Sequence, residues 1–508
     1  MNYSKQPRVD GSVLIWTLLI LALLALAGAE LLRVVSSKYN STLQAATWQE
    51  ALLAAESGVD LALLEMRKSL YPGANQAWQP PDWTVNGASN YGRTEILDAG
   101  RAGTDMRIKV NVDKPGGGPD NLFETPAGNE LPSLIDPNNP LDRSWDSYRI
   151  RAIGTMPMTG PARASDNKQD TRLRRLSLLT ERFADASLPA STLALAPEPF
   201  AGPQVSRRIE AIVRPVSSFD QAIVSDGTLN LNNLDIEIDS YDSRDPNKST
   251  NGLYDASKRQ ENGNIATNGN LINAGDAHIY GDVATNSGSV SGTANVTGVE
   301  RTDFYRELIP IDPPSWPSIN PSPSSVNHTN TTLTAHAERG HHLSRYILSE
   351  ITIAGGQRLT FAGNPGGSRT YIEIYVTGDI SVHGTADLIV DPGVQATIYF
   401  AGNVTVSGNG IINRNNQPGD LLLYGIQPPA NTARQVSLGG NANISAAVYA
   451  PGHDVTINGS GSNGHVYGSA VGKTVHMTGV TNLHYDEALS SGGKITDYRI
   501  VSWFEDTR

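Results

Sequence analysis

A cluster of acidic residues in a loop-rich stretch has the residue types and spacing that could bind a cation. The cluster consists of Asp235, Glu237, Asp239, Asp242, Asp245 and Asp255, with Asn247 and Asn251 nearby. Loop carboxylate and amide oxygens are the ligands that Ca²⁺ prefers, although this spacing matches neither an EF-hand nor the Ca²⁺-binding nonapeptide repeat. The stretch therefore fits either a solvated acidic loop or a calcium site held by Asp239, Asp242 and Asp245, and no other cofactor is predicted.

Histidine is the second residue type that could bind a metal. Seven of the ten histidines follow Gly340: His341, His342, His383, His453, His465, His476 and His484. A transition-metal site needs two or three of them to converge, and only His341 and His342 are close in sequence. Adjacent residues of a strand point to opposite faces, so we predict ordinary surface or corner histidines.

Signatures of catalysis are few. Residues 459–464 fit the pattern G-x-G-x-x-G, but a strand-like segment follows where a dinucleotide-binding site needs a helix. The chain contains no P-loop, no H-E-x-x-H and no G-x-S-x-G. Polysaccharide lyases and hydrolases need converging acids and bases, whereas Asp387 with Asp391, and Lys473 with His476, are close only in sequence. We predict that the protein is not an enzyme.

The composition favours a large, β-rich protein. The chain has 508 residues, which predicts about three domains, and its 49 Gly and 30 Pro against 8 Phe suit short strands and tight turns. A net charge of -12 argues against a nucleic-acid partner. The absence of cysteine excludes disulfides and cysteine-based sites.

An apolar run at Val13–Ala29 is about long enough to cross a membrane. The preceding segment carries Lys5 and Arg8, so we expect this flank to stay in the cytoplasm and the rest of the chain to face outward. A cleaved signal peptide, with a small-residue site at Ala27–Ala29, and a plain membrane anchor are the alternatives.

The helical pattern continues beyond this run. Between Glu30 and Leu70 there is no proline, and Tyr71-Pro72-Gly73 ends the pattern. Apolar residues recur there at spacings of three and four: Leu52, Ala55, Val59, Leu63, Met66 and Leu70. This spacing predicts one helix over 12–70, roughly 85 Å long, whose apolar stripe packs against a head domain.

These features resemble a type IV prepilin. A basic leader at 1–11 ends in a glycine before the apolar run, and Leu52–Val59 resembles the Ala-Glu-Ala-Gly stretch of PilX-type minor pilins. The resemblance implies that a prepilin peptidase cuts after Gly11 and that Ser12 becomes methylated. Trp16 stands where major pilins carry glutamate, which resembles the tip-located minor members.

The chain after residue 70 divides into segments that differ in residue composition and pattern. Strand-like alternation occurs at 106–112, 148–153, 173–183 and 208–213. It predicts a pilin-like head with an antiparallel sheet over 71–216, and hence an α+β N-terminal part. A β-rich region at 217–300 and a Pro-rich linker or strap at 301–325 follow.

A loose repeat marks 326–508. Ile374–Val382 is similar to Ile398–Val406, and Ala447–Ile457 is similar to Ser469–Met477. The glycines at 378, 402, 425, 452 and 472 are separated by 24, 23, 27 and 20 residues. This period predicts an all-β domain built as a β-solenoid, with glycines serving corners of positive φ, and a β-sandwich is the alternative. The stretch Gly468–Val475 resembles domains that are attached to PilX-type N-termini.

Together these features favour a minor pilin-like structural subunit with a surface β domain for adhesion or assembly. The expected partners are other pilin-like subunits, the inner membrane, the pilus assembly machinery, the prepilin peptidase and a surface polysaccharide or host or environmental ligand. The expected location is the inner membrane, then the periplasm or cell surface as part of a pilus. The alternatives are a type II secretion pseudopilin and a membrane-anchored β-helix protein that binds or degrades polysaccharide.

Overall fold

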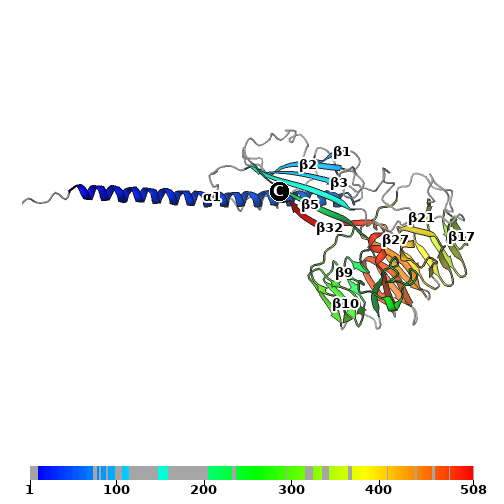
Figure 1. The fold of residues 1–508 in the computed structure, drawn as a ribbon. Coiled ribbons are helices and arrows are strands. Elements are labelled where there is room, and N and C mark those ends of the chain that lie inside the picture. The colour runs from blue at the N-terminus through cyan, green and yellow to red at the C-terminus, as the bar shows by residue number, and fades with distance from the viewer. Residues whose placement is uncertain are drawn as a thin grey trace, which may run out of the picture.

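A long helix, an antiparallel sheet and a large region of parallel strands make up the computed structural model (Figure 1). It describes residues 10–71, 77–78, 82–86, 90–97, 106–113, 147–157, 204–231, 236–292, 295–314, 324–334, 343–363, 369–408, 410–440, 443–459, 464–479 and 481–506.

Helix α1 (Asp10–Lys68) is continuous because no proline or turn signal interrupts it. Arg67 and Lys68 in its last turn complement the negative end of the helix dipole. Its N-terminal half projects away from the rest of the molecule (Figure 1), and this part of α1 is long and apolar enough to cross a membrane.

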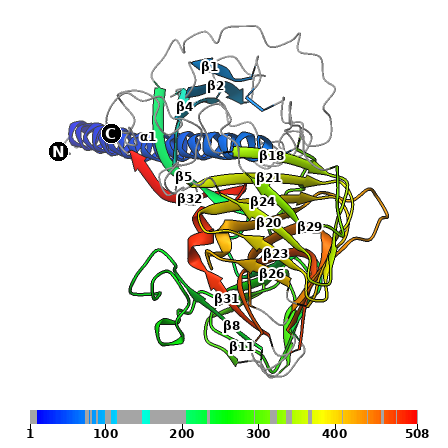
Figure 2. The same cartoon turned by 90° about the vertical axis from the view of Figure 1, so that its right-hand side faces the viewer.

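A six-stranded antiparallel sheet, the head sheet, covers the C-terminal half of α1 (Figure 2). Its strands, in spatial order, are β1 (Thr84–Asn86), β2 (Asn90–Leu97), β3 (Met106–Asp113), β4 (Tyr148–Pro157), β5 (Gln204–Ser217) and β32 (Ile495–Asp506). Strands predicted at 106–112, 148–153 and 208–213 correspond to β3, β4 and β5, and 173–183 lies outside the described residues.

The last strand of the chain belongs to this sheet. β32 pairs antiparallel with β5, whereas the sequence analysis grouped it with 326–508. Its Tyr498 is buried in the head core and Ile500 packs against that core, which explains the placement. Residues 218–494, which we call the β domain, are therefore inserted between two neighbouring strands of the head sheet.

The β domain consists of parallel strands in three ladders. The first ladder runs β18 (Leu343–Leu348), β21 (Thr370–Val376), β24 (Val394–Phe400), β27 (Leu421–Gly425), β29 (Ile444–Gly459), β30 (Gly464–Thr478), β6 (Ile223–Ser225), β9 (Ile265–Thr267), β12 (Val283–Ala284) and β15 (Glu300–Arg301). The second runs β16 (Val326–Asn327), β19 (Ile351–Ala354), β22 (Ile380–His383), β25 (Val404–Val406), β28 (Gln435–Gly440), the ends of β29 and β30, β7 (Leu229–Asn230), β10 (Leu271–Gly275) and β13 (Ser289–Gly292).

The third ladder has two parts. One part is β17 (Thr331–Thr334), β20 (Arg358–Ala362), β23 (Asp387–Val390) and β26 (Gly410–Asn413). The other is the start of β30 with β31 (Thr481–Asp486), β8 (Glu237–Tyr241), β11 (His278–Ile279) and β14 (Asn295–Val296). Short 3-10 helices lie at η1 (Ala256–Lys258), η2 (Pro418–Asp420) and η3 (Glu487–Ser491). Alternate strand residues point inward, and one continuous apolar core lies between the ladders.

The order of the ladders shows that two runs of chain form one stack: the first run consists of β6 to β15 and the second run of β16 to β31. The late strands β30 and β31 pair with the early strands β6, β7 and β8. Figure 2 shows β31 between β26 of the second run and β8 and β11 of the first run. The two β regions that the sequence analysis separated, 217–300 and 326–508, therefore share their ladders.

The Pro-rich segment crosses the outside of this stack. Residues 302–314, which we call the strap, leave β15 and return toward the second run. Ile309 and Ile311 are buried, the Tyr449 hydroxyl donates to the Ile309 carbonyl at 2.9 Å, and the Gln427 amide donates to the Ile311 carbonyl at 3.0 Å. The strap therefore packs against the stack, and 315–323 of the expected linker lie outside the described residues.

The repeated glycines serve a different purpose from the expected one. None of the five glycines that defined the repeat has a positive φ. A Cβ on Gly402 would lie 2.3 Å from the Gly378 carbonyl oxygen in the preceding turn. Glycine is required there because successive turns approach closely.

His453 gives the β domain a specific pH dependence. The side chain is fully buried with its ring 5.2 Å from that of Phe400, and burial lowers its pKa from 6.5 to about 4; nearby Arg434 adds to this, while the Gly402 carbonyl and Asp454 oppose it. The unfolded chain binds a proton at His453 more readily than the folded chain does. His453 therefore lowers the free energy of unfolding of the β domain as the pH falls from 6.5 toward 4.

We expect the free energy of unfolding of His453→Phe, relative to that of the wild type, to rise by roughly 3 kcal/mol as the pH falls over that range. Buried Asp420 and Asp486, whose pKa values burial raises to about 6, act in the opposite direction in both proteins, so the difference isolates His453. Denaturant unfolding at pH 7 and pH 4.5 measures it, with exposed His383→Phe as the control. A difference that does not change with pH would contradict the assignment.

Candidate functional site

The predicted apolar stripe of α1 lies against the head sheet. Ala55, Val59, Leu63 and Met66 are buried in the head core, and Leu52 packs against it. They face apolar residues of three strands, Ile108, Val110, Ile150, Ala152, Ile209 and Ala211. The C-terminal half of α1 is therefore an integral part of the head.

The other half of α1 exposes its apolar side chains all round. Fourteen of them are Ile15, Trp16, Leu18, Leu19, Ile20, Leu21, Leu23, Leu24, Leu26, Leu31, Leu32, Val34, Val35 and Tyr39. Such a surface is typical of a helix covered by lipid or by other helices. The Gly11–Ser12 bond lies in the first turn of α1.

The three proposed calcium ligands are engaged separately. Asp239 is fully buried, so the expectation of a solvated loop is wrong for this residue. Asp242 accepts hydrogen bonds from Arg244. Asp245 accepts from the amide of Asn247 at 2.9 Å. In the described part of the chain no three His, Asp or Glu side chains are placed to hold a metal ion together.

The two carboxylates considered for catalysis, Asp387 and Asp391, are likewise engaged elsewhere. Asp387 forms an ion pair with Arg358 at 3.1 Å, and Asp391 forms one with Arg414 at 2.7 Å. Each carboxylate is thus neutralised by its own arginine.

A buried hydrogen-bonded chain joins two histidines to Asp239. His484 Nδ1 lies 2.5 Å from an Asp239 carboxylate oxygen, and its Nε2 lies 2.8 Å from His465 Nδ1. The Tyr254 hydroxyl donates to the other Asp239 oxygen at 2.6 Å, and its ring stacks on His484 at 3.7 Å. The prediction that the histidines are ordinary surface or corner residues is wrong for His484, as it is for His453, because both are buried.

This chain of groups connects the start of the β domain to its end. Asp239 lies on β8, and His484 lies opposite it on β31. Asp239 accepts from His484 Nδ1, and when His484 Nε2 accepts from His465 Nδ1 all three groups have hydrogen-bond partners. Burial and His484 lower the pKa of His465, which favours the neutral form of His465. No local sequence pattern predicts this chain of groups, because 245 residues separate Asp239 from His484.

Arg306 connects the strap to both strands that enter the head. Its guanidinium pairs with Asp220 and donates to the Ser217 carbonyl at 2.8 Å and to the Thr496 hydroxyl at 2.7 Å. Its backbone amide donates to the Asn268 side chain at 2.8 Å. One nearly buried cation therefore holds the strap, a corner of the stack and the ends of β5 and β32 together.

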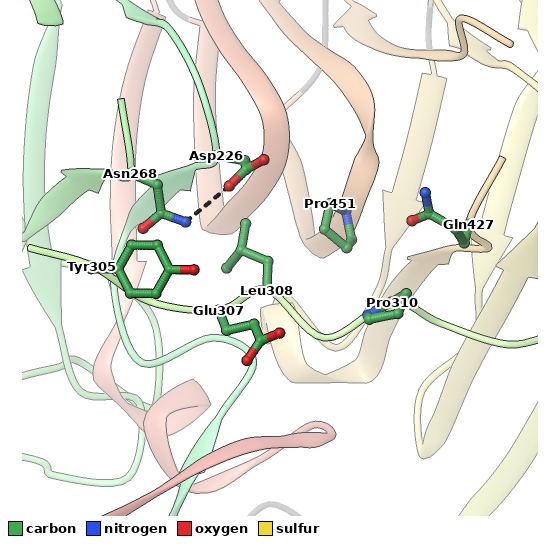
Figure 3. A pocket seen from close by; sticks show the side chains of 8 residues that line it. All are labelled: Asp226, Asn268, Tyr305, Glu307, Leu308, Pro310, Gln427 and Pro451. Atoms are coloured by element: carbon green, nitrogen blue, oxygen red, sulfur yellow. Dashed lines mark hydrogen bonds between the residues drawn. The ribbon is translucent and has the colours of Figure 1, made fainter. Parts of the chain in front are cut away.

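A pocket of about 460 Å³ lies beside this arginine, between the strap and two corners of the stack (Figure 3). Its lining residues are Asp226, Asn268, Tyr305, Glu307, Leu308, Pro310, Gln427 and Pro451. The first run, the second run and the strap all contribute to it, so it forms only when the two runs are stacked.

Comparison with known proteins gives one match. Residues 322–491 match the family described as a domain of unknown function (DUF7305), and they correspond to the second run of parallel strands, from β16 to η3. No match was found among curated proteins or among solved structures.

Proposed function

We propose that the protein is a minor pilin-like structural subunit that displays its β domain outside the cell for adhesion or assembly. The observation that carries the proposal is the division of α1. One half has an apolar surface suited to lipid or neighbouring helices, and the other half forms the core of a small antiparallel head. A simple membrane anchor has no need of a helix that continues from the span into the head core.

The proposed role of the β domain is a rigid surface module built as a β-solenoid. Three parallel ladders around one core and the stacked glycine turns support that architecture. Two antiparallel strands and the Arg306 contacts join the module to the head, so a load on it would pass to α1 through several connections.

Processing of the N-terminus tests the proposal. We expect mass spectrometry of the envelope protein to find a mature chain that begins at Ser12 and carries an N-methyl group. Gly11→Val should block cleavage, whereas Gly28→Ala should not, because a Cβ on Gly28 meets no atom within 4 Å. A chain that begins near Glu30 would indicate an ordinary signal peptide and contradict the proposal.

Immunogold labelling of sheared filaments gives a second measurement. Label on filaments is expected. A protein that stays in the membrane with no label on any filament would favour an anchored β domain, even if Ser12 were the first residue.

A further inference from the structure

The pocket beside Arg306 has a lining suited to one class of ligand. We propose that it binds a neutral saccharide, with Tyr305 as the platform for the sugar ring. The inference rests on the proposed function in one respect, namely that the β domain faces the outside of the cell.

Tyr305 is the first observation. Its side chain is 72% exposed, one of the most exposed large side chains outside α1, and it lies at the edge of the pocket (Figure 3). At the edge of a pocket, such a ring offers a flat apolar face beside the polar groups of the lining. The flat face of a sugar ring presents C–H groups that pack on such an aromatic face.

The polar groups of the pocket are the second observation. Two carboxylates, Asp226 and Glu307, and two amides, Asn268 and Gln427, line it. Asn268 is occupied by Asp226 and by the Arg306 backbone, so it positions the site. The carboxylates and the planar Gln427 amide, which carries an acceptor and a donor, can each engage sugar hydroxyls. The pocket volume lies within the range of small-ligand sites and suits one or two sugar units.

The charge of the lining excludes anionic ligands. Among the lining residues that the structure describes there is no Lys or Arg, so phosphate, sulfate or uronate groups would meet two carboxylates with no cation in that lining. The proposed ligand is therefore a neutral hexose or N-acetylhexosamine unit.

The placement of the carboxylates disfavours a cationic peptide. Asp226 already accepts a hydrogen bond from Asn268 at 2.9 Å, and Tyr71 of the head hydrogen-bonds to Glu307. Figure 3 shows the Leu308 side chain between the two carboxyl groups, so they do not converge on one point as an ammonium group requires.

The test uses the detergent-solubilised full chain on a glycan array that carries neutral, sulfated and uronic-acid oligosaccharides, followed by titration with the best binder. We expect binding to neutral saccharides, about tenfold weaker in Tyr305→Ala. Phe504→Ala removes an aromatic side chain that is 58% exposed on the head and should bind as the wild type does. Circular dichroism checks that both variants fold.

Three outcomes would overturn the inference. The first is no binding to any neutral saccharide, and the second is neutral-saccharide binding that Tyr305→Ala leaves unchanged. The third is a preference for the sulfated or uronic-acid oligosaccharides of the array, with affinity that falls steeply between about 50 and 500 mM NaCl because charge pairing is screened by salt. None of these bears on whether the chain is processed at Ser12, so failure of this inference and of the proposed function can be told apart.

Discussion

Replacing Gly154 with alanine is expected to separate α1 from the head sheet. A Cβ at this position of β4 would lie 2.0 Å from the Ala51 carbonyl oxygen and 2.6 Å from the Ala55 amide nitrogen. Both atoms belong to the helix backbone, which cannot move aside as a side chain can. We expect the head to lose about 3 kcal/mol or more of unfolding free energy. Amide hydrogen exchange of β3 and β4 measures the loss in the full chain.

Alanine substitutions at two other glycines serve as comparisons for the stability loss in Gly154→Ala. A Cβ on Gly58 of α1 would meet methyl groups of Ile108 and Val110 at 2.8 and 2.9 Å, which can shift, and alanine favours the helix by about 1 kcal/mol. Gly58→Ala should therefore cost clearly less than Gly154→Ala. Gly356→Ala, where no atom lies within 4 Å, should leave stability unchanged. Equal exchange rates in all three variants would show that close backbone contact does not hold α1 to the sheet.

Local patterns in the sequence predicted the parts of the fold that depend on local structure. The absence of proline and the three-to-four spacing predicted α1, and alternation predicted β3, β4 and β5. The repeat correctly paired segments of β21 with β24 and of β29 with β30, although its last two segments lie in single long strands rather than around a turn.

Long-range pairing could not be predicted in the same way. Parallel ladders can add a strand at either end, and the inward residues of both runs are mostly apolar. Nothing in the local pattern shows that β31 stacks on β8, or that the chain returns to the head as β32. A segment such as Ile495–Asp506 has an alternation that fits either sheet.

The polar contacts of the site were missed for a related reason. Asp239 looked like a member of an acidic loop because its neighbours in sequence are acidic, yet its partner is His484. Arg306 lies in a Pro-rich segment, where a lone arginine gives no signal. Each residue acquires its role from groups far away in the chain, which only the stacking of the two runs brings together.

The largest effect in the β domain is expected from Arg306→Met, which should loosen the junction with the head. The variant leaves the Asp220 carboxylate without its cation and removes the hydrogen bonds to Ser217 and Thr496. Breaking such a mostly buried pair costs about 3 kcal/mol. Proteolysis should then cut near 217–218 and 494–495, where the wild type resists, and thermal unfolding should begin at lower temperature.

A second substitution separates the lost charge pair from lost packing. If the unpaired carboxylate causes most of the effect, Asp220→Asn in the Arg306→Met background should recover part of the stability, because the buried charge is then gone. Arg301→Met is the matched control: it also removes a strap-side arginine paired with an aspartate, Asp303, but both side chains are more than half exposed. Such an exposed pair contributes little to stability because solvent screens it. If Arg301→Met and Arg306→Met were equally stable, the guanidinium would not be what fixes the β domain to the head, and the two antiparallel strands alone would have to hold it.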